Sequence, residues 1–548
     1  MVKAYNMKRF LFFIFGLFLL TACDDLFHEE QISIGDIENY DRLLEATGGV
    51  YGTLADAFSD NSFYAANAKG DDINLGNFIY DEYYSTGMHG NYNSIIQDPL
   101  NESAAWESMY KVIVSTNNIL GQFSPARSQS SEIKKVLGEI YLIRAYCYFK
   151  LTRTYGQIPL IGNIDIDYTV TKASYAEIYT FIENDLKMAM ELLPGNNNSA
   201  RIPCVTPHRG SAKALLAELY LSWAGYPAGD ASKYTLAANE AGEVIDSSGY
   251  FGFTLLDDFV WLWDKAHLLN SESVFSLYLP DPSDSEFNEL YWDYAWSFNT
   301  CFYVGFYSDR GTGVYYPPDM YIVTSFFPSE INFFDNFPRG YRKEVTFYTT
   351  LHFPDEIDSP YDDGSGCYHI DKIQSTRTRV GYQKFYLDAT KIEYTWSFVY
   401  GEGIQDSLLC KLYVGIPRIY LFRYAHTLLT YAEAMARAGQ PDAKAYECVN
   451  RIRRRARNVD LYSSSEYDLQ TGLSPETFAD SVVWERAWEL AAEPEGRWYD
   501  LVRLEMVENL PGLRHPNETG PPDSYDKSVY FFPIPDGDIE LNSYLGDE

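Results

Sequence analysis

Apolar residues recur at helical spacing in two long stretches, residues 36–250 and 416–510, and this pattern constrains the fold more than any other feature. The clearest helix is expected at residues 132–155, where apolar positions share one face: Ile133, Leu137, Ile140, Cys147 and Leu151. We expect Ser131 to cap its start, and Gly156 with Pro159 to end it. The pattern therefore predicts a mainly α-helical protein.

Further helical patterns fill most of both stretches, at residues 36–57, 104–123, 174–193, 206–223, 232–247, 417–438, 442–457 and 475–490. Several form pairs separated by short turns rich in Gly and Pro, as at residues 225–227 and 439–441. Such pairs resemble tetratricopeptide-like helical hairpins, although no strict repeat period is visible. We predict an α/α superhelical scaffold, interrupted at residues 250–415 by a large, irregular, loop-rich insertion with little helical period.

Arg144 lies on the apolar stripe of the helix predicted at residues 132–155. A buried guanidinium is costly unless a carboxylate pairs with it. We therefore predict that Arg144 is buried and paired with an acid from another helix.

The first residues have the pattern of an export signal. Lys8 and Arg9, which follow the expected start at Met7, precede an apolar run at residues 10–20. This run is shorter than the about 20 residues of a membrane-spanning helix. Residues 20–23, Leu-Thr-Ala-Cys, resemble the bacterial lipobox, whose cysteine is diacylated and becomes the new N-terminus. We expect a lipoprotein signal peptide at residues 1–22, lipidation of Cys23 and one folded unit at residues 23–548; the alternative is an ordinary signal peptide with an incidental cysteine.

The chain has 43 basic and 77 acidic residues, which gives a net charge of −34. This charge argues against nucleic-acid binding, because nucleic-acid phosphates need a basic protein face. Since no later segment has the apolar length of a membrane span, Cys23 is the expected membrane attachment.

The six other cysteines are far apart, which argues against zinc knuckles and thioredoxin-like motifs. We expect Cys147 and Cys448 to be buried thiols, and few or no disulfides.

The block from Tyr291 to Tyr316 holds eleven aromatic residues and keeps neither a helical nor a strand period for long. Aromatic rings stack on the C–H faces of sugars, and interleaved acids, amides and guanidinium groups bind hydroxyls. The candidate ligand-binding residues of this block are Trp292, Asp293, Trp296, Asn299, Arg310 and Tyr316. The alternative is that the aromatic side chains fill the core beneath a loop.

A second candidate region is the long loop expected inside the first hairpin, at residues 80–93. Tyr83 and Tyr84 are its candidate ligand-binding residues, and Asp71 and Asp72 precede it.

Three glutamates lie at helical spacing and resemble paired catalytic carboxylates: Glu485, Glu489 and Glu493. Three nearby arginines are expected to pair with them: Arg486, Arg497 and Arg503. Because such pairs hold the acids ionised, unlike a general acid, we predict a structural role. A surface glycosidase would need two carboxylates beside the aromatic block, and only Asp293 and Asp309 are candidates.

We predict no metal, no cofactor and no catalytic residue. The eight histidines have no metal-binding spacing, and the acids at residues 358–363 lack the alternation of a calcium loop. The basic run at residues 451–457 is expected to form a helix surface that pairs with carboxylates.

Several local sequences resemble motifs of the SusD/RagB family, in the family's order: residues 144–160, 423–434 (with His426 where an acid is commoner), 450–456, 485–503 and 532–535. The chain departs modestly from the family motif at residues 493–495, where Glu-Pro-Glu stands in place of a simpler Glu-Gly sequence.

The resemblance implies a fold with four tetratricopeptide-like hairpins and an irregular insertion. It also implies a nutrient-binding lipoprotein of the outer membrane that faces the exterior and covers a SusC-like TonB-dependent transporter. Family members capture an oligosaccharide, or sometimes a peptide, and no catalysis is implied. The resemblance places the ligand site in the two aromatic regions described above.

Overall fold

The computed structural model describes residues 40–59, 69–73, 99–123, 130–162, 169–278, 305–308, 322–323, 329–347, 350–352, 367–369, 382, 384, 390–400, 404–414, 418–515 and 525–546. The predicted signal peptide and Cys23 lie outside these residues.

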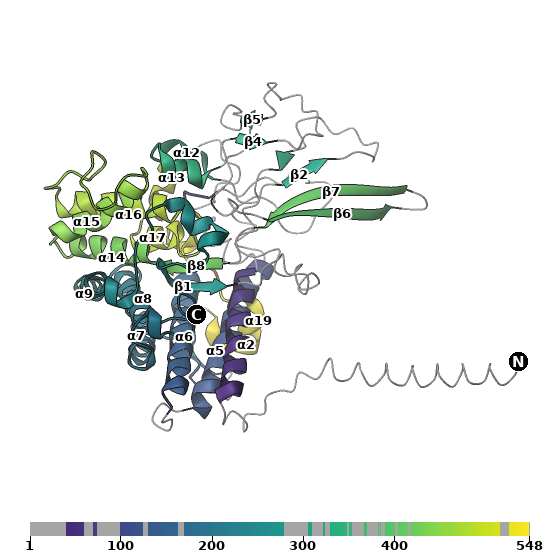
Figure 1. Ribbon diagram of the computed structural model, residues 1–548. Coiled ribbons are helices and arrows are strands. Elements are labelled where there is room, and N and C mark those ends of the chain that lie inside the picture. The colour runs from purple at the N-terminus through teal and green to yellow at the C-terminus, as the bar shows by residue number, and fades with distance from the viewer. Residues whose placement is uncertain are drawn as a thin grey trace, which may run out of the picture.

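Helices of the first stretch pack against one another in chain order. They are α2 (Tyr40–Ser59), α5 (Pro99–Gln122), α6 (Ser131–Tyr155), α7 (Tyr175–Leu192), α8 (Arg209–Ala224) and α9 (Lys233–Asp246). Each contacts the next, so α2 with α5, α6 with α7 and α8 with α9 form successive hairpins (Figure 1).

The second helical stretch continues this scaffold. It contains α14 (Tyr424–Arg437), α15 (Ala443–Arg455), α16 (Pro475–Glu489) and α17 (Arg497–Arg503). α14 packs on α8 and α9 as well as on α15 and α16, so the two stretches share one hydrophobic core that runs from Leu43 to Leu545. The predicted mainly α fold with tetratricopeptide-like hairpins is confirmed.

The ends of α6 show how the local sequence sets a helix. The Ser130 side chain accepts a hydrogen bond from the Ile133 N–H, so the N-cap is Ser130 and the prediction of Ser131 was wrong by one residue. At the other end Gly156 has a φ of 80°, which a glycine adopts without strain, and its N–H closes the last turn on Thr152 O.

The predicted pairing of Arg144 with an acid from another helix is confirmed, and the residue is partly rather than fully buried. Its side chain is 11% exposed, and its guanidinium donates to both carboxylate oxygens of Asp185 on α7, at 2.7 Å each. It also donates to Asn117 on α5, so one side chain links three helices. Cys147 and Cys448 are buried free thiols, as expected.

The helix predicted at residues 417–438 is wrong in its first part, because β8 (Arg418–Arg423) precedes α14 there. All six residues of β8 are buried, and the strand pairs antiparallel with β1 (Ser273–Tyr278). A strand buried on both faces shows no alternation, and its apolar run therefore merges with the helical pattern that follows.

The insertion contains more regular structure than predicted. β6 (Thr390–Tyr400) and β7 (Ile404–Val414) form a long antiparallel hairpin, within a sheet of strand order β3-β2-β7-β6 that includes β2 (Gly305–Ser308) and β3 (Ile322–Val323). Figure 1 shows this hairpin extending away from the helices. Apolar and polar residues alternate through residues 391–398, and this period of two would have predicted β6.

The remaining elements are short. They are α10 (Ser248–Phe251), η2 (Phe259–Trp263), η3 (Lys265–His267), α12 (Ile331–Asn336), α13 (Tyr341–Thr346), α18 (Leu510–Leu513), α19 (Asp536–Leu541), the paired strands β4 (Thr350–His352) and β5 (Cys367–His369), and the single 3₁₀ turns η1 (Asn197–Ser199), η9 (Val507–Asn509), η10 (Lys527–Val529) and η11 (Ser543–Leu545).

Candidate functional site

The side chains predicted to bind a ligand all lie outside the described residues: Tyr83, Tyr84, Trp292, Asp293, Trp296, Asn299, Arg310 and Tyr316. Asp309 and the acids at residues 358–363 lie outside them as well. Within the block from Tyr291 to Tyr316 the structure describes the course of Gly305–Ser308 as β2, which pairs with β7.

Two described residues that flank the candidate regions meet in space. Ile73, beyond which the chain continues toward Tyr83, forms an antiparallel bridge with Ser329. Ser329 follows the aromatic block, and the next N–H, that of Glu330, donates to Asp72 O at 3.0 Å. A residue that precedes the first region in sequence is therefore paired with a residue that follows the second.

Asp71 and Asp72, which precede the first candidate region, are buried. Arg497 donates to both carboxylate oxygens of Asp71, at 2.6 and 3.1 Å. These acids therefore support the protein interior and are not exposed to a ligand.

The carboxylate of Asp72 has an unusual environment. Its Oδ2 accepts the Ala492 N–H at 3.0 Å, whereas Oδ1 has no hydrogen-bond partner among the described residues. Burial and the charge of Asp71 raise the pKa of Asp72 to about 6, against the opposing effects of the Ala492 N–H and Arg497.

Glu485, Glu489 and Glu493 are paired with arginines, as predicted, but not with the arginines we expected. Their partners lie on other elements: Arg342, Arg423, Arg453, Arg455 and Lys384. Consecutive helix positions point about 100° apart, so Glu485 and its neighbour Arg486 face different parts of the protein.

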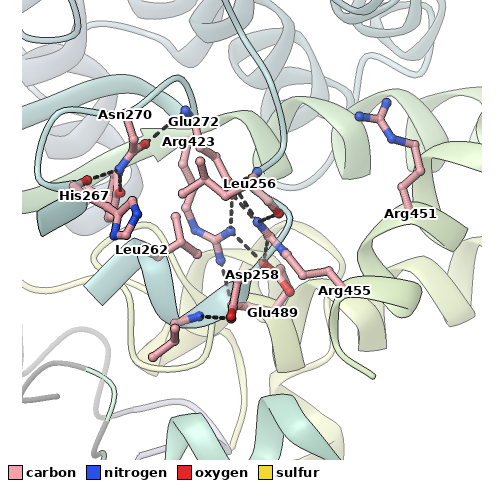
Figure 2. Close-up of polar contacts among 12 residues, drawn as sticks. Leu256, Asp258, Leu262, His267, Asn270, Glu272, Arg423, Arg451, Arg455 and Glu489 are labelled. Atoms are coloured by element: carbon pink, nitrogen blue, oxygen red, sulfur yellow. Dashed lines mark hydrogen bonds and ion pairs between the residues drawn. The ribbon is translucent and has the colours of Figure 1, made fainter. Parts of the chain in front are cut away.

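Glu489 lies at the centre of a buried charge network, which we define as four acids (Glu272, Glu485, Glu489 and Glu493) and four bases (Arg342, Arg423, Arg455 and Lys384). Figure 2 shows Arg423 and Arg455 converging on Glu272 and Glu489, while Arg451 points away. Glu489 Oε1 accepts from Arg423 and from Arg455 at 2.6 Å each.

The network keeps its acids ionised. Burial alone would raise the pKa of Glu489, but Arg455, Arg423 and Arg342 outweigh it and hold the pKa well below its usual range. For Glu493, Arg423 and Lys384 outweigh burial in the same way and lower the pKa to about 2. A general acid needs a raised pKa, so neither residue suits acid catalysis.

The three arginines expected to pair with these glutamates have other partners. Arg486 pairs with Glu218 and Asp500, Arg503 with Glu433 and Asp500, and Arg497 with Asp71. Together they tie α16 and α17 to α8, α14 and residues 69–73.

The basic run at residues 451–457 is only partly a helix surface. Arg454 and Arg455 are buried, and both pair with carboxylates. Glu272, which binds Arg455 and Arg423, was missed, because a single glutamate before a strand carries no sequence signal of burial.

In the part of the chain that the structure describes, no group of three or more His, Cys, Asp and Glu side chains is placed to hold a metal ion. No helix among the described residues is both long and apolar enough to cross a membrane.

Two family models match the chain. One, described as "Starch-binding associating with outer membrane", matches residues 36–221, and the other, described as "SusD family", matches residues 412–546. SusD-like protein P2 of Formosa agariphila is 26% identical over 559 aligned residues, which cover 98% of this chain and 99% of that protein. SusD-like protein P38 of the same organism is 23% identical, covering 93% and 94%.

Solved structures share the fold. A SusD homolog from Bacteroides thetaiotaomicron aligns with a TM-score of 0.68 at 21% identity, covering 93% of this chain and 97% of its own. A protein described as "Laminarin binding SusD-like protein" aligns with a TM-score of 0.64 at 23% identity, covering 92% and 98%. Surface glycan-binding protein A from Bacteroides fluxus aligns with a TM-score of 0.62 at 21% identity, covering 92% and 97%.

Proposed function

The chain belongs to the SusD/RagB family, and from this premise we propose that it is a cell-surface lipoprotein that binds oligosaccharides. It is anchored in the outer membrane through lipidated Cys23, faces the exterior and delivers its ligand to a SusC-like TonB-dependent transporter. It binds the glycan without cleaving it. One unit at residues 23–548 does this, with the helical scaffold at residues 36–250 and 416–510 supporting the insertion at residues 250–415.

The observation that carries the ligand site is the bridge between Ile73 and Ser329. It pairs a residue that precedes the first region with a residue that follows the second, and both regions are rich in aromatic and polar residues. A sugar site needs flat rings together with hydrogen-bonding groups, and the two segments supply both. We propose that Trp292, Trp296 and Tyr316 form the stacking platform and that Asp293, Asn299 and Arg310 select among hydroxyls, with Tyr83 and Tyr84 contributing from the first loop.

Relatives support glycans as the ligand class, since one matching family model is described as starch-binding and one structural neighbour as laminarin-binding. Calorimetry with maltohexaose and laminarihexaose tests this directly. We expect Trp292→Ala and Trp296→Ala to weaken binding at least tenfold while the melting temperature stays near that of wild type, because a truncated stacking residue loses contact area and not fold.

Trp261→Ala is the matched control, because Trp261 is a partly buried tryptophan that stacks on His267 elsewhere. Normal binding by both Trp292→Ala and Trp296→Ala would mean that other residues form the stacking platform. Unfolding of both would show that these two rings belong to the core. Cleavage of either labelled oligosaccharide would favour a surface glycosidase that uses Asp293 and Asp309. Peptide binding without glycan binding would favour the peptide-binding alternative.

Anchoring is tested by replacing Cys23 with Ala and fractionating the cells. We expect the protein to leave the membrane fraction, since the acyl chains are its proposed attachment and diacylation is needed for stable binding. Unchanged membrane retention would refute the anchor. A Cys204→Ala variant controls for the loss of a thiol.

A further inference from the structure

Five consecutive residues, Lys69–Ile73, are buried, and we call them the anchor segment. The C-terminal part of the chain holds this segment from one side. Arg514 donates to Gly70 O at 2.7 Å, Arg497 binds Asp71, and the Ala492 N–H binds the Asp72 carboxylate.

The insertion holds the same segment from the other side. Asp72 O accepts the Glu330 N–H at 3.0 Å and the Tyr382 hydroxyl at 2.6 Å, and Ile73 bridges to Ser329. Asp72 is thus bound through its side chain to the loop after α16 and through its carbonyl to the insertion.

The hydrogen bond between Ala492 and Asp72 joins two residues that each carry an energetic cost. Ala492 has a φ of 59°, the left-handed region that side chains other than glycine's disfavour. Asp72 Oδ1 is buried, and no described residue provides it with a hydrogen bond. Strained backbone and half-satisfied buried groups concentrate where a fold is held in place for function, because stability alone would remove them.

We propose that the anchor segment is a positioning element of the ligand site, with Asp72 as its positioning residue. It fixes the chain that continues toward Tyr83 and Tyr84 relative to the chain that returns from the aromatic block. This inference rests on the proposed function for its ligand. The part that does not depend on the ligand is that two hydrogen bonds are coupled through Asp72: the one from the Ala492 N–H to its carboxylate and the one from the Glu330 N–H to its carbonyl.

Two measurements on the full mature chain test the coupling. Asp72→Ala removes the acceptor for the Ala492 N–H, whereas Asp72→Asn keeps an acceptor oxygen. We expect Asp72→Ala to speed hydrogen exchange of the Glu330 amide about fivefold, the equivalent of one neutral hydrogen bond, and to weaken binding of laminarihexaose or maltohexaose by a similar factor. Asp72→Asn should restore both values to near wild type.

Asp442→Ala is the matched control, because the Asp442 carboxylate also accepts a backbone N–H, at 2.7 Å from Ala445, at a remote site. It should change neither value. If Asp72→Ala does not fold, Asp72→Leu replaces it, since leucine is similar in size to aspartate and also lacks an acceptor for the Ala492 N–H.

The inference would be overturned if the folded Asp72 variant exchanged its Glu330 amide and bound the oligosaccharides as the wild type does. If the wild type binds neither oligosaccharide, the proposed function fails for these glycans. In that case the exchange of the Glu330 amide alone decides whether the anchor segment couples the two contacts.

Discussion

The guanidinium of Arg144 is enclosed by side chains of three helices. Its two hydrogen bonds to Asp185 and one to Asn117 use three of its five N–H donors, and it lies 5.0 Å from the centre of the Phe181 ring. Such a pair adds little net stability as a whole, but each partner depends on the other, because an unpaired buried charge has lost its hydration.

We predict that Arg144→Met, with Asp185 left in place, lowers the free energy of unfolding by about 3 kcal/mol or more. Urea denaturation measures this. Lys187→Met is the control: it breaks the exposed pair with Glu183, and such pairs contribute less than about 1 kcal/mol. A loss below about 1 kcal/mol for Arg144→Met would show that Asp185 does not need its partner.

The inward position of Arg144, which is partly buried, was predictable, because the residue lies on an apolar stripe of one helix. Its partner was not, since Asp185 lies on another helix and only packing brings the two together. The same reason explains the misassigned partners of Glu489 and the missed Glu272. The local sequence indicates that a charged side chain faces the core, whereas the identity of its ion-pair partner depends on the tertiary structure.

At the scale of single elements, two helices use histidine at their N-termini. The His208 Nδ1 accepts the Gly210 N–H at the start of α8, and the His426 Nδ1 accepts the Arg423 N–H at the start of α14. Both imidazoles are buried. Burial lowers the pKa of His208 to about 4, and burial with the charges of Arg423 and Arg486 lowers the pKa of His426 to about 4.

These depressed pKa values predict acid sensitivity. Because an unfolded histidine has a pKa of about 6.5, the unfolded chain binds more protons between about pH 6.5 and pH 4, and stability falls as the pH is lowered through this range. We predict that His208→Asn weakens this pH dependence, since Asn is a good N-cap and does not titrate.

Urea denaturation at pH 7.5 and pH 5 measures the difference. His267→Asn, at a partly exposed histidine, controls for the loss of an imidazole. An unchanged difference between the two pH values in His208→Asn would mean that His208 is not a source of the acid sensitivity.

At the scale of the whole molecule, the helical scaffold was predictable because each helix carries its own period. The contact that unites the two stretches, α14 on α9, was not, since 177 residues separate the end of α9 from the start of α14 and no local pattern marks it. For the ligand site, the sequence predicts two aromatic regions, and the structure adds that Ile73, before the first, is paired with Ser329, after the second. The choice among individual rings stays a prediction.

Net charge acts on the molecule as a whole. The buried charge network contains as many bases as acids, so the excess of 34 negative charges lies outside it and repels itself in the compact state. Salt screens charges at the surface, with a screening length that falls from about 30 Å at 0.01 M to about 3 Å at 1 M, but it screens buried pairs much less.

We therefore predict that the melting temperature rises when NaCl is increased from about 0.01 to 0.5 M, because repulsion at the surface is screened while the buried network keeps its strength. Thermal melts at fixed pH measure this. Choline chloride at the same ionic strength is the control, since screening depends on ionic strength and not on the cation. A melting temperature that falls as either salt is added would mean that favourable exposed pairs, such as Lys111 with Glu107, outweigh the repulsion among the excess acids.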